Sequence, residues 1–194
     1  MRKKDLSECP NAVEGGVFFR TASFLLYHLA AAPFSFIIGH LIYGLRVKGR
    51  KYFRGHKNGM IAANHCQFME PAFSGLALWP RKVFFSAEEN NIVRRDVGWL
   101  VRLVRAFGIP DKNPLSVGTL VTKALKKNWF VHFYPEGVLY WRSQEPAPFM
   151  EGVFFFAYLN NVPVFPLAEV LKDRPIRRII PWWPPRTLFV FCPP

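Results

Sequence analysis

The sequence predicts an α/β fold in which a mostly parallel central sheet is flanked by helices, with a membrane-associated helix pair at the amino terminus. After Gly49, short apolar runs alternate with stretches of helical periodicity, the order expected of strands joined by crossover helices. Before Gly49, residues 21–45 contain no Asp, Glu, Lys or Arg. These two patterns divide the 194 residues into a helical segment, residues 1–48, and one α/β domain, residues 49–194.

The uncharged segment at residues 21–45 is roughly long enough to cross a bilayer as a helix. Pro33 lies near its middle and should interrupt that helix. Two short helices that meet near Ala32–Pro33 and lie in the headgroup layer satisfy this pattern. A true span, a buried core helix and a secretory signal are the alternatives. Basic residues flank both ends and give no clear orientation: Arg2, Lys3, Lys4 and Arg20 before the segment, Arg46, Lys48 and Arg50 after it.

Within residues 49–194 the expected elements alternate in type. The wholly apolar run at residues 60–63 predicts a buried strand, and Pro71, at a favoured first position, predicts a helix over residues 71–79. Apolar residues at helical spacing predict helices over residues 97–107 and 117–127. The other expected elements are strands at 83–85 and 129–134, a strand that begins with residues 162–167, a strand from Leu188 onwards, a helix at 152–159, and a rigid, proline-rich surface loop at 181–185.

The net charge of the chain restricts its partners. Lys and Arg outnumber Asp and Glu by 26 to 13, which gives a formal net charge of +13. Such a chain is attracted to nucleic acid, to an anionic bilayer or to phosphorylated small molecules. The basic residues show no zinc-finger spacing and no glycine–aromatic RNA-binding signature, and they are interleaved with apolar stretches. This pattern favours anionic membrane lipids as the partner and ranks nucleic acid last.

The three cysteines, Cys9, Cys66 and Cys192, form no CxxC pair. They therefore indicate neither a disulfide framework nor a structural zinc site, and a reducing setting at the cytoplasmic face of the cell membrane is expected. Zinc hydrolysis through His56, His65 and Cys66 is the remaining metal alternative. Because these positions lack a metal-ligand pattern, no metal is expected.

The first candidate catalytic group directly follows the strand at residues 60–63. Asn64 and His65 come at the end of this strand, and Glu70 precedes Pro71 at the start of the next helix. A turn over the residues between them can bring the Glu70 carboxylate to one imidazole nitrogen of His65, while the other nitrogen accepts a proton from a substrate hydroxyl. An isolated His and Glu at this spacing are also typical of an ordinary strand-end histidine.

A second candidate group follows the strand at residues 129–134. Pro135-Glu136-Gly137 places a carboxylate on a tight turn, at the same end of a parallel sheet as His65. By itself this is a common loop, and only its combination with the first group raises the specificity of the pattern.

Together with the Val-Pro-Val-x-Pro strand at residues 162–166, these motifs resemble the glycerophospholipid acyltransferase family, which includes the 1-acylglycerol-3-phosphate acyltransferases. The resemblance covers about residues 60–167. It implies transfer of an acyl group from acyl-CoA or acyl-carrier protein to the hydroxyl of a lysophospholipid-like acceptor, with 1-acylglycerol-3-phosphate favoured. It also implies His65 as the base with Glu70 as its partner, an acceptor-binding region containing Asn64, Glu136 and Gly137, and no cofactor beyond the acyl donor.

The sequence departs from the pattern of this family at several positions. Glu70 stands where the family has Asp, and Lys112 stands about where it commonly has an arginine for the acceptor phosphate. Arg142 follows Pro-Glu-Gly at a greater distance than the usual arginine, which makes it a displaced acceptor-binding candidate. The end at Pro194 indicates either a missing carboxyl-terminal segment or an unusually compact domain. The alternative function is a membrane lipid-binding protein of the same fold whose catalysis is weak or lost.

Overall fold

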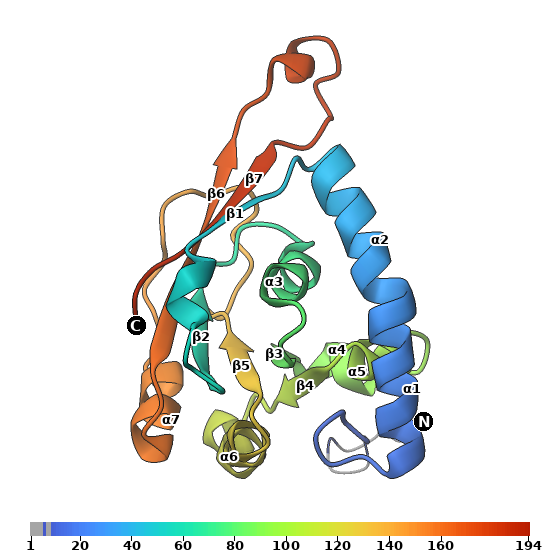
Figure 1. The fold of residues 1–194 in the computed structure, drawn as a ribbon, viewed down its shortest axis with the longest axis vertical. Coiled ribbons are helices and arrows are strands. Elements are labelled where there is room, and N and C mark those ends of the chain that lie inside the picture. The colour runs from blue at the N-terminus through green and yellow to red at the C-terminus, as the bar shows by residue number, and fades with distance from the viewer. Residues whose placement is uncertain (1–5, 7–8) are drawn as a thin grey trace.

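The computed structural model describes Leu6 and residues 9–194, and in this part of the chain seven strands form one sheet (Figure 1). The strand order is β1-β7-β6-β2-β5-β3-β4, and every neighbouring pair is parallel except β6 and β7. The predicted mostly parallel α/β sheet is therefore confirmed. The strands are β1 (Arg46–Lys48), β2 (Gly59–Ala63), β3 (Val83–Glu88), β4 (Ala106–Ile109), β5 (Phe130–Phe133), β6 (Val164–Lys172) and β7 (Arg186–Phe191).

Helices cover both faces of this sheet. On one face α3 (Glu70–Leu78), α4 (Glu89–Val93), α5 (Gly98–Leu103) and the amino-terminal helix pack over a core that includes Ile61 and Phe165. On the other face α6 (Gly118–Lys126) and α7 (Gly152–Asn160) pack over a core that includes Met60 and Ala62. All five residues of β2 are buried, because alternate side chains enter the two cores. The central strand of the sheet can therefore hold the residues that follow it in a fixed position.

The amino-terminal helix differs in one respect from the expected pair. Two α-helical segments are present, but π-helical turns join them into one continuous helix over Val17–Ile42, and the chain does not separate at Ala32–Pro33. Pro33 lies in the first turn of α2, and the Ala32 amide donates to the carbonyl of Tyr27, five residues earlier. This π turn accommodates the missing proline N–H without breaking the helix. The segments are α1 (Val17–Leu26), η2 (Tyr27–Ala31), α2 (Ala32–Ile37) and η3 (Ile38–Ile42).

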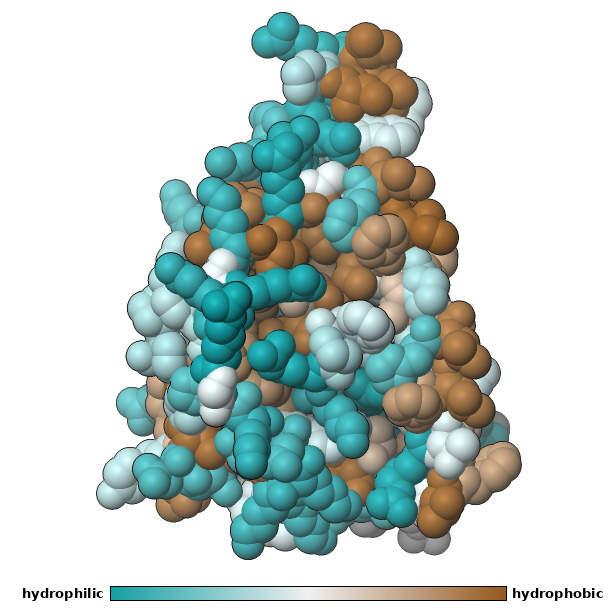
Figure 2. All heavy atoms as spheres, in the orientation of Figure 1, coloured by the Kyte–Doolittle hydropathy of each residue, from teal (hydrophilic) through white to brown (hydrophobic). Residues whose placement is uncertain are grey.

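One side of this helix faces outward and is apolar, and hydrophobic residues follow that border of the molecule in Figure 2. Its 26 residues are long and apolar enough to cross a membrane, and only 17% of its most apolar window is buried. A helix in a protein core would be mostly buried, so the exposed face suggests association with lipid. Arg2, Lys3 and Lys4 lie outside the described residues. The exposed apolar residues are Val17, Phe18, Phe24, Leu25, Leu29, Phe34, Phe36, Ile37 and Leu41.

Strands β1 and β4, the short helix α4 and one helix boundary were not expected from the sequence. The helix expected over residues 97–107 ends at Leu103, because Arg105 adopts a positive φ of 72° and the chain then enters β4. β1 lies within the expected amino-terminal segment, residues 1–48, yet it pairs with β7. The other expected strands and helices are confirmed, with ends shifted by a few residues, and β6 is extended from Leu167 to Lys172.

Candidate active site

The site lies where two central strands end side by side. β2 and β5 are parallel neighbours, with Ala62 in register with Phe133. The residues that follow them, Asn64 and His65 after β2 and the Tyr134–Gly137 turn after β5, therefore emerge at the same edge of the sheet. The structure thus brings together the two motifs that the sequence separates by about 70 residues.

The carboxylate of Glu70 closes the turn between β2 and α3. One of its oxygens, Oε1, accepts hydrogen bonds from the backbone amides of Cys66 and Gln67, the latter at 2.6 Å. The other oxygen, Oε2, accepts a hydrogen bond from Nδ1 of His65. Glu70 is only 1% exposed, so nearly all of its hydration is replaced by these three donors.

His65 is oriented by this bond. A carboxylate can only accept, so Nδ1 carries the hydrogen and the neutral ring leaves Nε2 with a free lone pair. Nε2 has no hydrogen-bond partner among the described residues, and the His65 side chain is 22% exposed. The ring of Tyr134 stacks on the imidazole, with centroids 4.1 Å apart and planes 20° apart. The imidazole is therefore fixed on one face and at one nitrogen, and its second nitrogen is available.

Glu136 supports the main chain of this turn. Its side chain is buried; Oε2 accepts from the backbone amide of His65 at 3.2 Å, and Oε1 accepts from the amide of Ala147 at 3.3 Å. Gly137 has a φ of 72°, and a Cβ there would overlap the side chain of Met150. The Pro-Glu-Gly turn therefore fixes the main chain at His65 through Glu136, a structural contact that was not expected from the sequence.

The residues after this turn bring Arg142 beside the histidine. The Tyr140 amide donates to the His65 carbonyl at 2.9 Å, and the Arg142 amide donates to the Cys66 carbonyl at 2.7 Å. The side chain of Arg142 is exposed, with its guanidinium 5.6 Å from the centre of the Trp141 ring. Lys112 is also exposed, but it follows β4, which β3 and β5 separate from β2. Of the two predicted phosphate-binding residues, Arg142 adjoins the His65 turn and Lys112 follows a more distant strand.

Asn64 is engaged with β6. Its side-chain Nδ2 donates to the carbonyl of Glu169 at 3.1 Å, and its Oδ1 accepts from the amide of Glu169 at 2.7 Å. This pair of bonds continues the parallel ladder of β2 and β6 by one residue. The structure thus places the Asn64 amide group against the neighbouring strand, where it fixes the start of the turn.

Glu169 is a site residue that the sequence analysis missed; it lies on β6 beyond residues 162–167, which were expected to begin this strand. Its carboxyl group is buried and accepts a hydrogen bond from Nε2 of Gln67, which also donates to Oγ1 of Thr187 at 2.9 Å. Burial, with the adjacent Glu70 carboxylate, raises the pKa of Glu169 well above its ordinary value. The Glu169 carboxyl group is therefore expected to keep its proton at a pH where an ordinary carboxyl group is ionised.

Three potential metal-binding atoms, from Cys66, Glu70 and Glu169, lie within 4.8 Å of one another. Both oxygens of Glu70 already accept hydrogen bonds, and burial raises the pKa of the Cys66 thiol, which disfavours a metal-binding thiolate. The donor set therefore fits a hydrogen-bonded network around the histidine better than a cation site.

Comparisons with known proteins give a family for the sequence and a relative for the fold. The sequence profile of the Acyltransferase family matches residues 44–170. The fold resembles the crystal structure of the 1-acyl-sn-glycerophosphate acyltransferase PlsC from Thermotoga maritima, with a TM-score of 0.57 and 19% sequence identity, over 90% of this chain and 75% of that chain. No protein with a curated description matches the sequence significantly.

The buried Glu169 generates a prediction for stability against pH. Its folded-state pKa is raised above 4.5, so the folded protein binds the proton more tightly than the unfolded chain does. Its contribution to stability is complete below pH 4.5 and is lost as the pH rises through the folded pKa, by up to about 1.4 kcal/mol per pH unit. Glu169→Gln should remove this loss, as measured by urea unfolding in detergent micelles from pH 4 to pH 8.

Glu145→Gln is the matched control, because it removes a carboxylate from an exposed position. We expect its free energy of unfolding to follow the wild-type pH profile. Parallel profiles for wild type and Glu169→Gln over the whole range would contradict a buried, protonated Glu169.

Proposed function

The chain belongs to the acyltransferase family, and on this premise we propose that it transfers a fatty acyl group from a thioester donor to the hydroxyl of a lysophospholipid-like acceptor. The observation that carries the proposal is the His65–Glu70 pair, which leaves Nε2 of the partly exposed His65 without a hydrogen-bond partner among the described residues. The donor is acyl-CoA or acyl-carrier protein. The favoured acceptor is 1-acylglycerol-3-phosphate, since the fold resembles a protein described as acting on that lipid.

In the proposed reaction His65 is the general base. Its Nε2 takes the proton from the acceptor hydroxyl as the oxygen attacks the thioester carbonyl. The tetrahedral intermediate then breaks its carbon–sulfur bond, and His65 returns the proton to the departing thiolate. Glu70 holds the imidazole in the reactive tautomer and stabilises the imidazolium that forms between the two transfers. We propose no metal and no resident cofactor for this step, because the acyl donor is itself a substrate.

Because Glu70 stands in place of the usual aspartate, the alternative function was that of a lipid-binding protein that has lost catalysis. The longer side chain reaches Nδ1 of His65 with one oxygen and the turn amides with the other. This contact provides the same kind of support that an aspartate would give and favours the enzyme over the inactive alternative.

For the acceptor phosphate we propose Arg142 as the ligand. Its backbone is hydrogen-bonded to the residue after His65, while its guanidinium is exposed and carries no ion pair among the described residues. A guanidinium binds a phosphate through two parallel hydrogen bonds, which would fix the acceptor hydroxyl relative to Nε2.

For the location we propose the cytoplasmic face of an anionic membrane. The outward apolar side of the amino-terminal helix suits a lipid environment, and the net charge of +13 suits anionic headgroups. Cys9, Cys66 and Cys192 are all free thiols, as in a reducing compartment.

Substitution of the proposed base tests the reaction. We expect His65→Ala to lower the rate of acyl transfer by about 10²–10⁴-fold, the usual contribution of a general base. The rate is measured as release of free thiol from acyl-CoA, and separately from acyl-carrier protein, with 1-acylglycerol-3-phosphate as the acceptor. His56→Ala is the control, because His56 is exposed and precedes β2 rather than following it. The proposal fails if wild-type protein transfers no acyl group from either donor while it still binds lipid.

Substitution of the two basic candidates tests the acceptor site. Arg142→Gln should raise the KM for 1-acylglycerol-3-phosphate roughly ten-fold and leave the KM for the acyl donor unchanged, because it removes one charged hydrogen-bond partner. Lys112→Gln is a matched loss of charge at an exposed position on the same sheet edge, and its KM should stay close to wild type. The reverse ranking of the two variants would assign the phosphate to Lys112.

A further inference from the structure

The connection between β6 and β7 projects from one end of the molecule. After Lys172 pairs with Arg186, residues 173–185 extend beyond the sheet to the top of Figure 1. The segment includes a short helix, η6 (Pro175–Arg178), and the amides of Arg177 and Ile179 make turn hydrogen bonds within it. Four prolines restrict its backbone, namely Pro175, Pro181, Pro184 and Pro185. We refer to residues 173–185 as the hairpin tip.

Two large apolar side chains are almost fully exposed on the hairpin tip. Ile179 is 82% exposed and Trp182 is 79% exposed. Hydrophobic residues also lie at this end of the molecule in Figure 2. Tryptophan beside basic residues is typical of the interface of a bilayer, where the ring lies among the headgroups.

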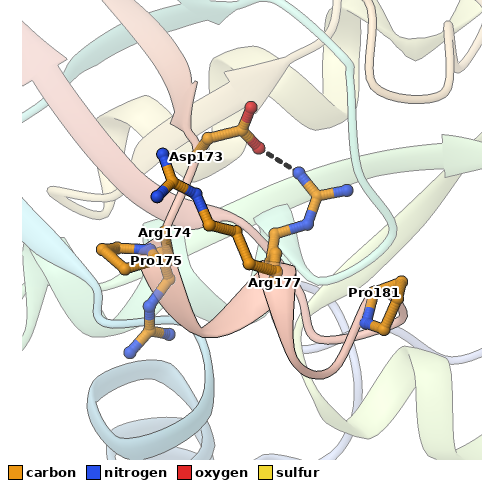
Figure 3. A pocket seen from close by; sticks show the side chains of 6 residues that line it. Asp173, Arg174, Pro175, Arg177 and Pro181 are labelled. Carbon is orange, nitrogen blue, oxygen red and sulfur yellow. Dashed lines mark hydrogen bonds and ion pairs between the residues drawn. The ribbon is translucent and has the colours of Figure 1, made fainter.

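Arginines lie next to these apolar residues. Arg174, Arg177 and Arg178 line an open hollow of about 520 Å³, together with Asp173 and two prolines (Figure 3). Asp173 pairs with Arg177. The Arg178 side chain is exposed and has no ion-pair partner in the part of the chain that the structure describes. The hollow therefore carries a net positive charge and has the dimensions and donors to receive an anionic headgroup.

The hairpin tip is also joined to the amino-terminal helix. Arg174 donates from a guanidinium nitrogen to the carbonyl of Ile42, the last residue of η3, at 2.6 Å. Just below, the Thr187 amide donates to the carbonyl of Tyr43 at 3.0 Å. These bonds hold the tip beside the end of the helix, whose outward residue Leu41 is 71% exposed. The hairpin tip therefore begins beside the carboxyl end of the amino-terminal helix (Figure 1).

We propose that the hairpin tip is a second membrane contact, which inserts Ile179 and Trp182 into the interface of an anionic bilayer and binds lipid phosphate in the arginine hollow. The apolar side chains gain by leaving water, the arginines lie at the level of the phosphates, and the prolines reduce the entropy lost on binding. The proposal concerns binding and does not depend on catalysis.

Vesicle binding tests the energetic part of this proposal. For the full chain diluted from detergent onto vesicles of equal parts phosphatidylcholine and phosphatidylglycerol, Ile179→Ser with Trp182→Ser should lower the partition coefficient at least about ten-fold. Arg178→Gln should lower it about five-fold on these vesicles and not on pure phosphatidylcholine. Tyr158→Ser is the control, since Tyr158 is 84% exposed on α7, which packs on the opposite face of the sheet from the helix. Equal partitioning of all variants would overturn the proposal.

A location measurement tests whether the tip itself enters the bilayer. In a Cys192→Ser background, a fluorophore on Trp182→Cys should be quenched by lipids that carry a nitroxide in the upper acyl chain, and one on Tyr158→Cys should not. The other two cysteines, Cys9 and Cys66, are buried. Equal quenching at the two positions would overturn the proposal. So would a shift from dimer to monomer in Trp182→Ser without loss of vesicle binding, which would assign the tip to contact with a second copy of the chain.

Discussion

The hydrogen bonds accepted by the buried Glu70 carboxylate organise the rest of the site. An ionised carboxylate that is 1% exposed is tolerated only where donors replace its hydration. Three donors do so, namely the amides of Cys66 and Gln67 and Nδ1 of His65. The same contacts shape the turn, begin α3 and set the tautomer of the histidine. The same hydrogen bonds therefore both fold the turn and orient the proposed base.

The surrounding strands hold this turn from two sides. The turn after β5 contributes Tyr134, which stacks on the imidazole, and Glu136, which accepts from the His65 amide. β6 contributes Glu169, whose backbone pairs with Asn64 and whose carboxyl group binds Gln67. Since β2 lies between β5 and β6 in the sheet, the turn is fixed where three strands meet. Such fixed geometry lets a histidine act as a base without reorganisation during the reaction.

The sequence predicted those parts of the structure that depend on local patterns. The apolar run before Asn64 and the proline after Glu70 located the turn, and parallel strands brought the Pro-Glu-Gly turn to the same edge. The function of side chains in long-range contacts could not be predicted this way. Asn64 and Glu136 were expected in the acceptor-binding region, and their hydrogen bonds to backbone groups 105 and 71 positions away were not foreseen. Glu169 was missed because a polar residue on a buried strand gives no periodic signal.

Nitrogen-15 NMR of histidine-labelled protein tests the central claim, that Glu70 sets the tautomer of His65. The two ring nitrogens of a neutral histidine have different chemical shifts according to which one carries the hydrogen, and His65→Ala identifies the signals. We predict that the neutral His65 ring carries its hydrogen on Nδ1 in wild-type protein, and that Glu70→Ala, which removes the acceptor, produces a mixture of tautomers. A wild-type ring that carries its hydrogen on Nε2 would contradict the account, because that nitrogen could not then accept a proton.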